Sequence, residues 1–569
     1  MIIKNRSFWV VFCVAWSVWL LPSSLFAQKG EFTLRIVDEK TKRPLDCRLE
    51  IRSEKGVAKQ AQDVPFLYDH NAVPGEATLY FPVGVYPMTI ERGLEYLPRT
   101  GHFVLNRGAK DMKTVELRRF VDLSQKGWWS GDFCVLRRED ELEQLMKSDD
   151  VHFVPRLSTQ FATQTQETRF DLDRIRTEGD WFLDRDDCGV SLLNRTSELV
   201  PPFLATIDDA RTPLLELYLL KKMEPDLWFD LHNADSWDVP LLAALGMLDS
   251  VQILGSRLLR DDMLPQVVDW GGLPKFKTAR KTSDYFKEKE GAVENSGASL
   301  PSAMRFDRGI DPVRYRGARG RQRWTEDVYF HLLNTGRRLP PSAGSGSGLS
   351  PNPVGANRVY VWVDRNEYER TADDSEFESA GGNAGFNREM WWESFRSGAA
   401  FVTNGPLFDL RVDGELPGYI FEFEDEKPVA LQASLTLSLR NQADYIEVIM
   451  NGKTLQSIPF RKYAESGSLP PIEITQSGWF LLRVVMRTEG GYCCAMSAPY
   501  YVRMGGKIGA SSDSALFFLR WALARAKQLR ESGAFEGENG KNLEKLCEFS
   551  VQYWRREYEK AREEASELE

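Results

Sequence analysis

The segment from Asp226 to His232 carries the side chains best suited to metal chemistry in this sequence. It reads Asp-Leu-Trp-Phe-Asp-Leu-His and is apolar enough to predict a buried strand, on which Asp230 and His232 share one face. A carboxylate and an imidazole are both ligands of zinc. Because α/β sites form where strands end, the pair is a candidate for one side of a metal centre. The alternative is that His232 is a hydrogen-bonded core residue.

Histidine is scarce in this chain, and that limits the kind of metal site it can build. The four histidines other than His232 are His70, His102, His152 and His331. The first two belong to a β-rich N-terminal segment. His152 lies between apolar residues and His331 lies in an apolar helical stretch, so both are expected to be satisfied inside the fold. A multinuclear cluster needs several imidazoles at fixed geometry, and the sequence therefore argues against one.

The elements that must position these residues are predicted as an α/β region with β-rich flanks. Residues 28–118 alternate apolar and polar positions, which predicts a small β-sandwich, and the hairpin from Asp38 to Leu45 resembles that of carboxypeptidase-regulatory-like modules. Residues 119–405 alternate short apolar runs with helical patterns, which predicts an α/β layer or barrel. Within this region a polar stretch, residues 275–323, is predicted as a basic insertion that is solvated or binds a polyanion.

The C-terminal part is predicted to return to β-structure and to end in helices. Residues 406–505 alternate again, and Asn451-Gly452 is a strong hairpin signal, because a type I′ turn needs positive φ at both central positions. We expect a second β-sandwich here. Residues 506–569 are rich in Ala, Leu, Arg and Glu, which predicts two helices separated by a stretch from Gly533 to Gly540.

Three motifs in the predicted α/β region resemble one enzyme family. They are Trp128-Trp-Ser-Gly-Asp-Phe-Cys-Val-Leu136, the glycine-serine segment from Ser342 to Tyr360, and Phe401-Val-Thr-Asn-Gly-Pro406. Together they resemble the polymerase-and-histidinol-phosphatase (PHP) metallohydrolases, in the carbaryl-hydrolase-like branch, over residues 120–505. The resemblance implies a distorted (β/α) barrel and metal-dependent hydrolysis of small esters, carbamates or phosphoesters.

The resemblance also shows where this chain departs from active relatives. Their first motif carries two histidines, and this sequence has Cys134 and Leu136 in those places. Ser345 to Gly348 stand where relatives carry a further ligand pair. The full metal cluster of the family therefore cannot form. One Zn or Mn ion could still be held by Asp132, Asp230 and His232, with Cys134 as a fourth ligand and Asp186 as a base.

The alternative is a non-catalytic protein of the cell envelope that binds a glycan, a small molecule or a protein partner. The paired tryptophans Trp128-Trp129 and Trp391-Trp392, with Trp237, could stack on a ligand, although core packing is the default for tryptophan. The net charge of −10 argues against nucleic acid as a partner. In either case the protein is expected to be secreted or periplasmic.

Residues 1–27 carry the signal on which that location rests. Lys4 and Arg6 precede an apolar run from Ser7 to Leu21, as in a secretory signal peptide cut after Ala27, and no membrane span is expected after cleavage. Six of the seven cysteines follow this point, at Cys47, Cys134, Cys188, Cys493, Cys494 and Cys547. Six thiols in so long a chain allow one or two disulfides but do not make a disulfide framework.

Overall fold

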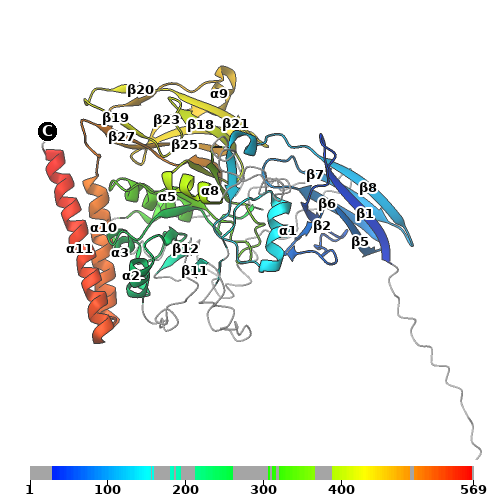
Figure 1. The fold of residues 1–569 in the computed structure, drawn as a ribbon, viewed down its shortest axis with the longest axis horizontal. Helices are drawn as coiled ribbons and strands as arrows, with labels where there is room; N and C mark the ends of the chain where they lie inside the picture. Colours follow the sequence, from blue (N-terminus) through cyan, green and yellow to red (C-terminus); the bar gives the residue numbers. More distant parts are fainter. Residues whose placement is uncertain are drawn as a thin grey trace, which may run out of the picture.

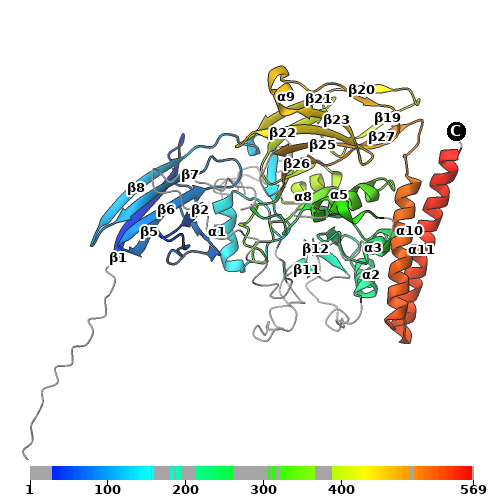
Figure 2. The ribbon, with the colours of Figure 1, turned by 180° about the vertical axis from the view of Figure 1, so that it is seen from behind.

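The computed structural model describes residues 29–155, 157–158, 180–184, 188–193, 212–260, 306–307, 310–315, 320–364, 388–486 and 492–566. The N-terminal sheets lie at one end of the molecule and the two C-terminal helices at the other (Figure 1). The central α/β part lies between them, with the C-terminal sheets packed along one side of it, as the view from behind also shows (Figure 2). The signal segment, residue Asp186 and most of residues 275–323 lie outside the described residues.

Two antiparallel-rich sheets with one shared apolar core make up the N-terminal part. The first has the order β5-β1-β8, with β1 Lys29–Asp38, β5 Glu76–Pro82 and β8 Lys110–Leu117. The second has the order β3-β4-β2-β6-β7, with β2 Cys47–Ile51, β3 Phe66–Leu67, β4 His70–Val73, β6 Gly84–Glu91 and β7 Arg99–Leu105. Phe32, Leu34 and Ile36, whose alternation predicts a strand, are buried in this core.

A mixed sheet of six strands carries Asp230, and His232 directly follows the strand that holds it. Its order is β10-β11-β12-β13-β14-β15, and the strands are β10 Leu157–Ser158, β11 Asp180–Asp184, β12 Gly189–Leu193, β13 Trp228–Leu231, β14 Ser250–Leu254 and β15 Pro341–Ala343. The accompanying helices are α1 Glu139–Asp149, α2 Leu214–Met223, α3 Val239–Ala244, α5 Gly320–Leu333 and the 3₁₀ helix Pro312–Tyr315.

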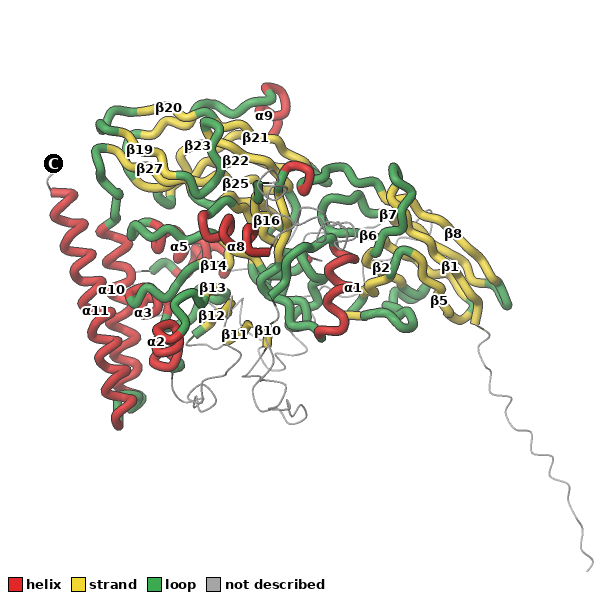
Figure 3. Tube along the Cα trace, in the orientation of Figure 1, coloured by secondary structure: helices red, strands yellow, loops and turns green. Residues whose placement is uncertain are grey.

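A second large sheet, of nine strands, joins the central part to the C-terminal part (Figure 3). Its path is β19-β27-β25-β26-β17-β16-β9, with β22 and β23 attached through β25. The strands are β9 Trp128–Gly131, β16 Arg358–Trp362, β17 Ala400–Thr403, β19 Ile420–Phe423, β22 Ala443–Met450, β23 Lys453–Pro459, β25 Gly478–Met486, β26 Cys493–Ser497 and β27 Tyr500–Met504. Because β17 pairs with β26, the sheet continues across residue 405.

The remaining C-terminal elements cover this second sheet. Two small antiparallel sheets pair β18 with β21 and β20 with β24. The strands of these two sheets are β18 Leu407–Val412, β20 Val429–Leu431, β21 Ala433–Ser438 and β24 Ile472–Ile474. Helix α9 Phe460–Ser466 also belongs to the C-terminal part. Helix α8 Arg388–Ser397 and the 3₁₀ helix Ser124–Lys126 come earlier in the chain.

The fold is mixed α/β, as predicted, but the described strands do not close into a barrel. In the six-stranded sheet β12 runs antiparallel to both β11 and β13, whereas a (β/α) barrel needs parallel strands joined by helical crossovers. The strand that carries the first motif, β9, pairs with β16 in the other sheet. The predicted barrel is therefore corrected to two open sheets in the described part of the chain.

The tryptophan pairs serve the core rather than a ligand-binding surface. Trp128, Trp129, Trp391 and Trp392 are all buried. The Trp391 ring stacks on Phe153 with centroids 4.3 Å apart, and its Nε1 donates to the main-chain oxygen of Trp129 at 3.0 Å. Offset stacking and a satisfied indole N–H are what a buried tryptophan requires. Trp237 is partly buried and packs against the same apolar cluster.

The C-terminal chain forms two long helices that pack against the central part. They are α10 Ser512–Glu531 and α11 Gly537–Ser566, and they contact α2, α3 and α5. Arg525 of α10 donates through Nε to the buried carboxylate of Asp238 at 2.6 Å, and Trp554 of α11 donates to the main-chain oxygen of Pro240 at 2.8 Å. These two contacts fix both helices to the start of α3. Among the described helices, none has the length and apolar content needed to cross a membrane.

The cysteines of the described chain are all buried. Cys493 and Cys494 are adjacent in β26 and belong to different apolar clusters, so their side chains point to opposite faces of the sheet, as expected for neighbours in a strand. Cys47, Cys493, Cys494 and Cys547 are free thiols. Burial raises the pKa of Cys493 to about 12 and that of Cys547 to about 12, so both are protonated and unreactive at neutral pH.

Candidate functional site

Asp230 lies in β13 and is buried among polar side chains of two neighbouring strands. Its Oδ1 accepts hydrogen bonds from the hydroxyls of Ser250 (2.6 Å) and Ser342, and its Oδ2 accepts from Nε2 of Gln252 (3.2 Å). Strand register sets this arrangement, because Asp230 lies opposite Ser250, and Ser342 lies opposite Gln252. Nε1 of Trp228 donates to Ser250 Oγ at 2.8 Å, which leaves the Ser250 proton to point at Asp230.

His232 directly follows the end of β13 and interacts with a different strand from Asp230. Its Nδ1 lies 3.2 Å from the hydroxyl oxygen of Ser191 in β12. The imidazole is close enough to Asp230 to favour the ionised carboxylate. The hydrogen bond between His232 and Ser191 and that between Asp230 and Ser250 nevertheless lie on opposite sides of β13. Asp230 and His232 therefore lie at the same end of β13, but Asp230 bonds residues of β14 and β15, whereas His232 bonds a residue of β12.

Asp132 follows β9, and its carboxylate accepts hydrogen bonds from main-chain N–H groups of the first motif and of the segment 345–355. Its Oδ1 accepts from the main-chain N–H of Cys134 (3.0 Å) and of Ser345 (2.9 Å), and its Oδ2 accepts from the main-chain N–H of Gly355 (2.7 Å). The carboxylate is fully buried. Buried main-chain donors need acceptors, and this one side chain satisfies three of them. Asp132 is therefore the residue that holds the segment 345–355 against the first motif.

Cys134 is buried against the glycine-serine segment. A Cβ on Gly344 would lie 2.4 Å from Cβ of Cys134 and 2.8 Å from Nε2 of Gln252, so only glycine allows these side chains to pack so closely. The main-chain oxygen of Cys134 accepts from the N–H of Gly346 at 2.8 Å, and Leu136 N–H donates to the oxygen of Ser347 at 2.8 Å. The segment from Ser345 to Gly348 is thus a tight turn fixed to residues 134–136.

Both candidate carboxylates have a pKa above the ordinary value. Burial raises the pKa of Asp132 to about 6, against the opposing effect of its hydrogen bonds from Ser345, Gly355 and Cys134. Burial likewise raises the pKa of Asp230, while its bonds from Ser250 and Ser342 oppose the shift. In both carboxylates, hydrogen bonds from the chain oppose the effect of burial on the pKa.

The donor sets of these residues do not fit a bound metal ion. Three of the hydrogen-bond positions on each carboxylate are taken by donors of the chain itself, and Asp132 lies beside β9 of one sheet while Asp230 lies in β13 of the other. In the part of the chain that the structure describes, no three His, Cys, Asp or Glu side chains are grouped so as to hold a metal ion. Asp186, the predicted base, lies outside the described residues.

The other two central histidines take structural positions. His152 Nδ1 lies 3.0 Å from the hydroxyl of Ser130, and His331 Nδ1 lies 2.9 Å from the hydroxyl of Ser514. The His331 ring also stacks on Phe517 with centroids 4.2 Å apart. Burial lowers the pKa of each imidazole to about 4, so both are neutral at physiological pH.

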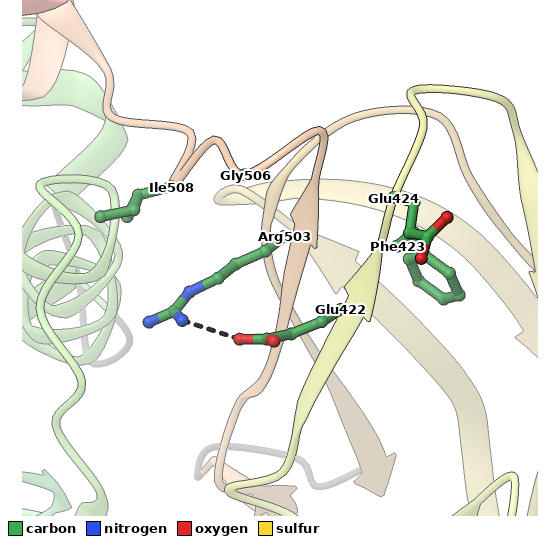
Figure 4. A pocket seen from close by; sticks show the side chains of 6 residues that line it. All are labelled: Glu422, Phe423, Glu424, Arg503, Gly506 and Ile508. Carbon is green, nitrogen blue, oxygen red and sulfur yellow. Dashed lines mark hydrogen bonds and ion pairs between the residues drawn. The ribbon is translucent and has the colours of Figure 1, made fainter.

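A surface hollow of about 430 Å³ lies between β19 and the end of β27 (Figure 4). Arg503 and Glu422 point toward one another across it and form an ion pair with Nη1 and Oε1 2.8 Å apart. None of the residues predicted for the metal site lines this hollow. An exposed ion pair of this kind contributes little and marks no chemistry of its own.

The partners of Asp230 are the functional residues that sequence reasoning missed. Ser250 and Gln252 lie two residues apart in an otherwise apolar run, so both face the same side of a strand. Polar residues on the buried face of a strand signal an interior hydrogen-bond network. The polar pattern of Ser250 and Gln252 is visible in the sequence. Their acceptor, Asp230, cannot be identified from it, because that pairing depends on the strand register.

The comparisons with known proteins leave the chain without an assigned relative. No protein-family model matches it, no curated protein sequence matches it, and no solved structure matches it.

Proposed function

We propose that this chain is a divergent relative of the PHP metallohydrolases that has lost the hydrolytic reaction and acts as a binding protein outside the cytoplasm. The observation that carries the proposal is the use made of Asp132 and Asp230. Each carboxylate accepts three hydrogen bonds from donors of its own chain. These carboxylates are proposed to serve the fold: Asp132 ties the segment 345–355 to the first motif, and Asp230 links β13 to β14 and β15 within one sheet.

The ligand chemistry at neighbouring positions supports the same conclusion. Catalytic zinc sites keep three protein ligands and an open position for water. Leu136 offers no ligand atom, and Cys134 is packed against Gly344 with its main-chain groups engaged in the turn. Without a metal-bound water there is no group here to attack an ester, a carbamate or a phosphoester. The apolar run behind Lys4 and Arg6 supports export of the chain.

The test is hydrolysis by the full chain of an aryl acetate, an aryl carbamate and an aryl phosphodiester, each with added Zn²⁺ or Mn²⁺. We expect rates equal to those of the metal ion alone, with no response to a chelator. Turnover above that background, abolished by a chelator and by His232→Ala but retained in His102→Ala, would contradict the proposal. His102 is the matched control because it is an exposed histidine in β7, far along the chain from the central part.

A further inference from the structure

A cavity of about 80 Å³ lies where the N-terminal, central and C-terminal parts meet. The N-terminal sheets contribute Arg48 of β2 and Glu91 of β6, and the central part contributes Asp149 at the end of α1. Helix α1 lies beside β2 at this junction (Figure 2). The C-terminal part contributes Arg440, from the loop between β21 and β22. One bound water needs about 10–15 Å³ of such space, so the cavity has room for a small polyatomic ligand.

Four guanidinium groups line this cavity, and they outnumber its carboxylates. They belong to Arg48, Arg260, Arg358 and Arg440, and the lining carboxylates are those of Glu91 and Asp149. Arg48 bonds both carboxylates, and Arg260 bonds Glu91 at 2.5 Å and also Glu50, which lies outside the lining, at 2.8 Å. Even with Glu50 counted, the cavity keeps an excess of positive charge.

Two of these arginines form no direct ion pair among the described residues, although the charge of Glu91 acts on Arg440 and the charge of Arg358 acts on Asp150. Arg358 is 1% exposed and donates only to main-chain oxygens, those of Gly355 (2.6 Å), Asp149 (3.0 Å) and Asp150 (3.3 Å). Arg440 donates to the main-chain oxygens of Gly93 and Tyr96. Glu91 already pairs with Arg48 and Arg260, and Asp150 with Arg92 and Arg119. Buried cations whose neighbouring carboxylates are shared in this way are unfavourable, and a bound anion reduces that penalty.

Two guanidinium N–H groups at this cavity are without an acceptor, which also favours a bound anion. Nε of Arg48 and Nε of Arg440 are buried and have no hydrogen-bond partner in the described part of the chain. Arg48 as a whole is only 5% exposed. Burial together with the nearby charges of Arg48, Arg260 and Arg358 lowers the pKa of Arg440 to about 10 despite the attraction of Glu91. A guanidinium offers a planar set of donors that matches the oxygens of a phosphate.

We propose that this cavity binds a phosphate-sized oxyanion, either the free ion or the phosphate group of a larger ligand, and that the bound anion joins the three parts of the molecule. The inference is independent of the proposed loss of hydrolysis, because it uses none of the candidate metal ligands. Binding to the folded chain alone would raise the thermal stability as the ligand concentration rises, with the logarithm of that concentration once it exceeds the Kd.

The test is calorimetric titration of the full chain with inorganic phosphate, paired with thermal unfolding at rising phosphate concentration. We expect one site per chain and a higher midpoint of unfolding. Arg440→Met should weaken binding about tenfold or more, since a hydrogen bond to a charged group is worth about one tenfold step or two in affinity. Arg440 is chosen because its removal leaves no carboxylate unpaired, and Arg503→Met, which removes an exposed arginine, should bind as the unmodified chain does.

A further titration, with phenyl phosphate, identifies the source of the anion. Phenyl phosphate that binds as well as inorganic phosphate would support the phosphate group of a larger ligand, and phenyl phosphate that fails to bind would support the free ion. Absence of any heat or stabilisation from inorganic phosphate up to about 10 mM would overturn the proposal for the unmodified chain, whatever the variants do. Equal binding by a folded Arg440→Met variant would overturn it as well.

Discussion

Replacing Asp132 with alanine is expected to lower the free energy of unfolding by about 3 kcal/mol near pH 8. The substitution leaves the buried main-chain N–H groups of Cys134, Ser345 and Gly355 without their acceptor. Each unsatisfied buried donor costs about 1–3 kcal/mol. Relief of the buried charge, whose pKa lies at about 6, offsets up to about 3 kcal/mol of that sum. The lost hydrogen bonds therefore outweigh the relief.

The pH dependence of this effect has a definite sign. The pKa of Asp132 in the folded chain, about 6, lies above that of an unfolded aspartate, so the unmodified chain gains stability from this group as pH falls from 7 toward 4. The alanine variant lacks that gain, and the difference between the two is expected to be about 1 kcal/mol larger near pH 5 than near pH 8. Urea denaturation at both pH values measures this difference.

Asp111→Ala, at an exposed position in β8, is the control and should change stability by less than about 0.5 kcal/mol. An Asp132→Ala chain as stable as this control would show that the carboxylate is no anchor.

Replacing Arg525 with alanine is expected to destabilise the attachment of the C-terminal helices by about 4 kcal/mol. Arg525 and Asp238 are both buried, and Nε donates to Oδ1 at 2.6 Å. Removing one partner of a buried pair leaves an uncompensated charge and costs about 3–5 kcal/mol. The hydroxyl of Thr212 still donates to Asp238 and limits the loss. Hydrogen exchange of the α10 and α11 amides, together with urea denaturation, reports the detachment.

The matched control lies on the same helix. Arg520 pairs with Asp307 at 2.8 Å, but its side chain is 55% exposed, so Arg520→Ala is expected to cost about 0.5 kcal/mol. Equal effects of the two substitutions on exchange and stability would contradict the assignment of Arg525 as the buried link between α10 and α3.

Local signals in the sequence predicted the elements they directly encode. The Asn451-Gly452 pair forms the turn between β22 and β23, with φ of 50° and 79° at the two positions. The apolar run that ends at His232 contains β13. The spacing from Glu139 to Met146 is typical of a helix, and the helix found there, α1, extends to Asp149. In each case the determining interactions lie within a few residues.

Predictions that depended on distant partners were less accurate. The alternating run from Val429 to Leu439 is divided into β20 and β21, which pair with different strands, β24 and β18. The run from Asp150 to Pro155 forms no strand and makes only a single bridge between Phe153 and Gly131. An alternation of apolar residues shows that a segment is half-buried, but not which strand it pairs with.

The candidate site illustrates the same limit. Residue types and spacing indicated Asp230 and His232, and the resemblance of the first motif to the PHP metallohydrolases indicated Asp132 and Cys134; carboxylate, thiolate and imidazole are the usual zinc ligands. What the sequence could not supply is the identity of their hydrogen-bond partners. Gly355 lies 223 residues from Asp132, and Ser342 lies 112 residues from Asp230. Asp230 and Ser342 are brought together by the strand register within one sheet, and Asp132 meets Gly355 of the loop between β15 and β16; no local pattern encodes either contact.

The central claim is that the carboxylates of Asp132 and Asp230 accept hydrogen bonds from the chain and do not bind a metal ion. Metal analysis of the purified full chain, expressed with ample Zn, Mn and Fe, tests this claim most directly. Ligands already occupied by donors of the chain should leave less than about a tenth of an equivalent of any of these metals bound after gel filtration. One equivalent of metal that survives gel filtration, is lost in Asp230→Asn and is retained in Asp111→Asn would contradict this account.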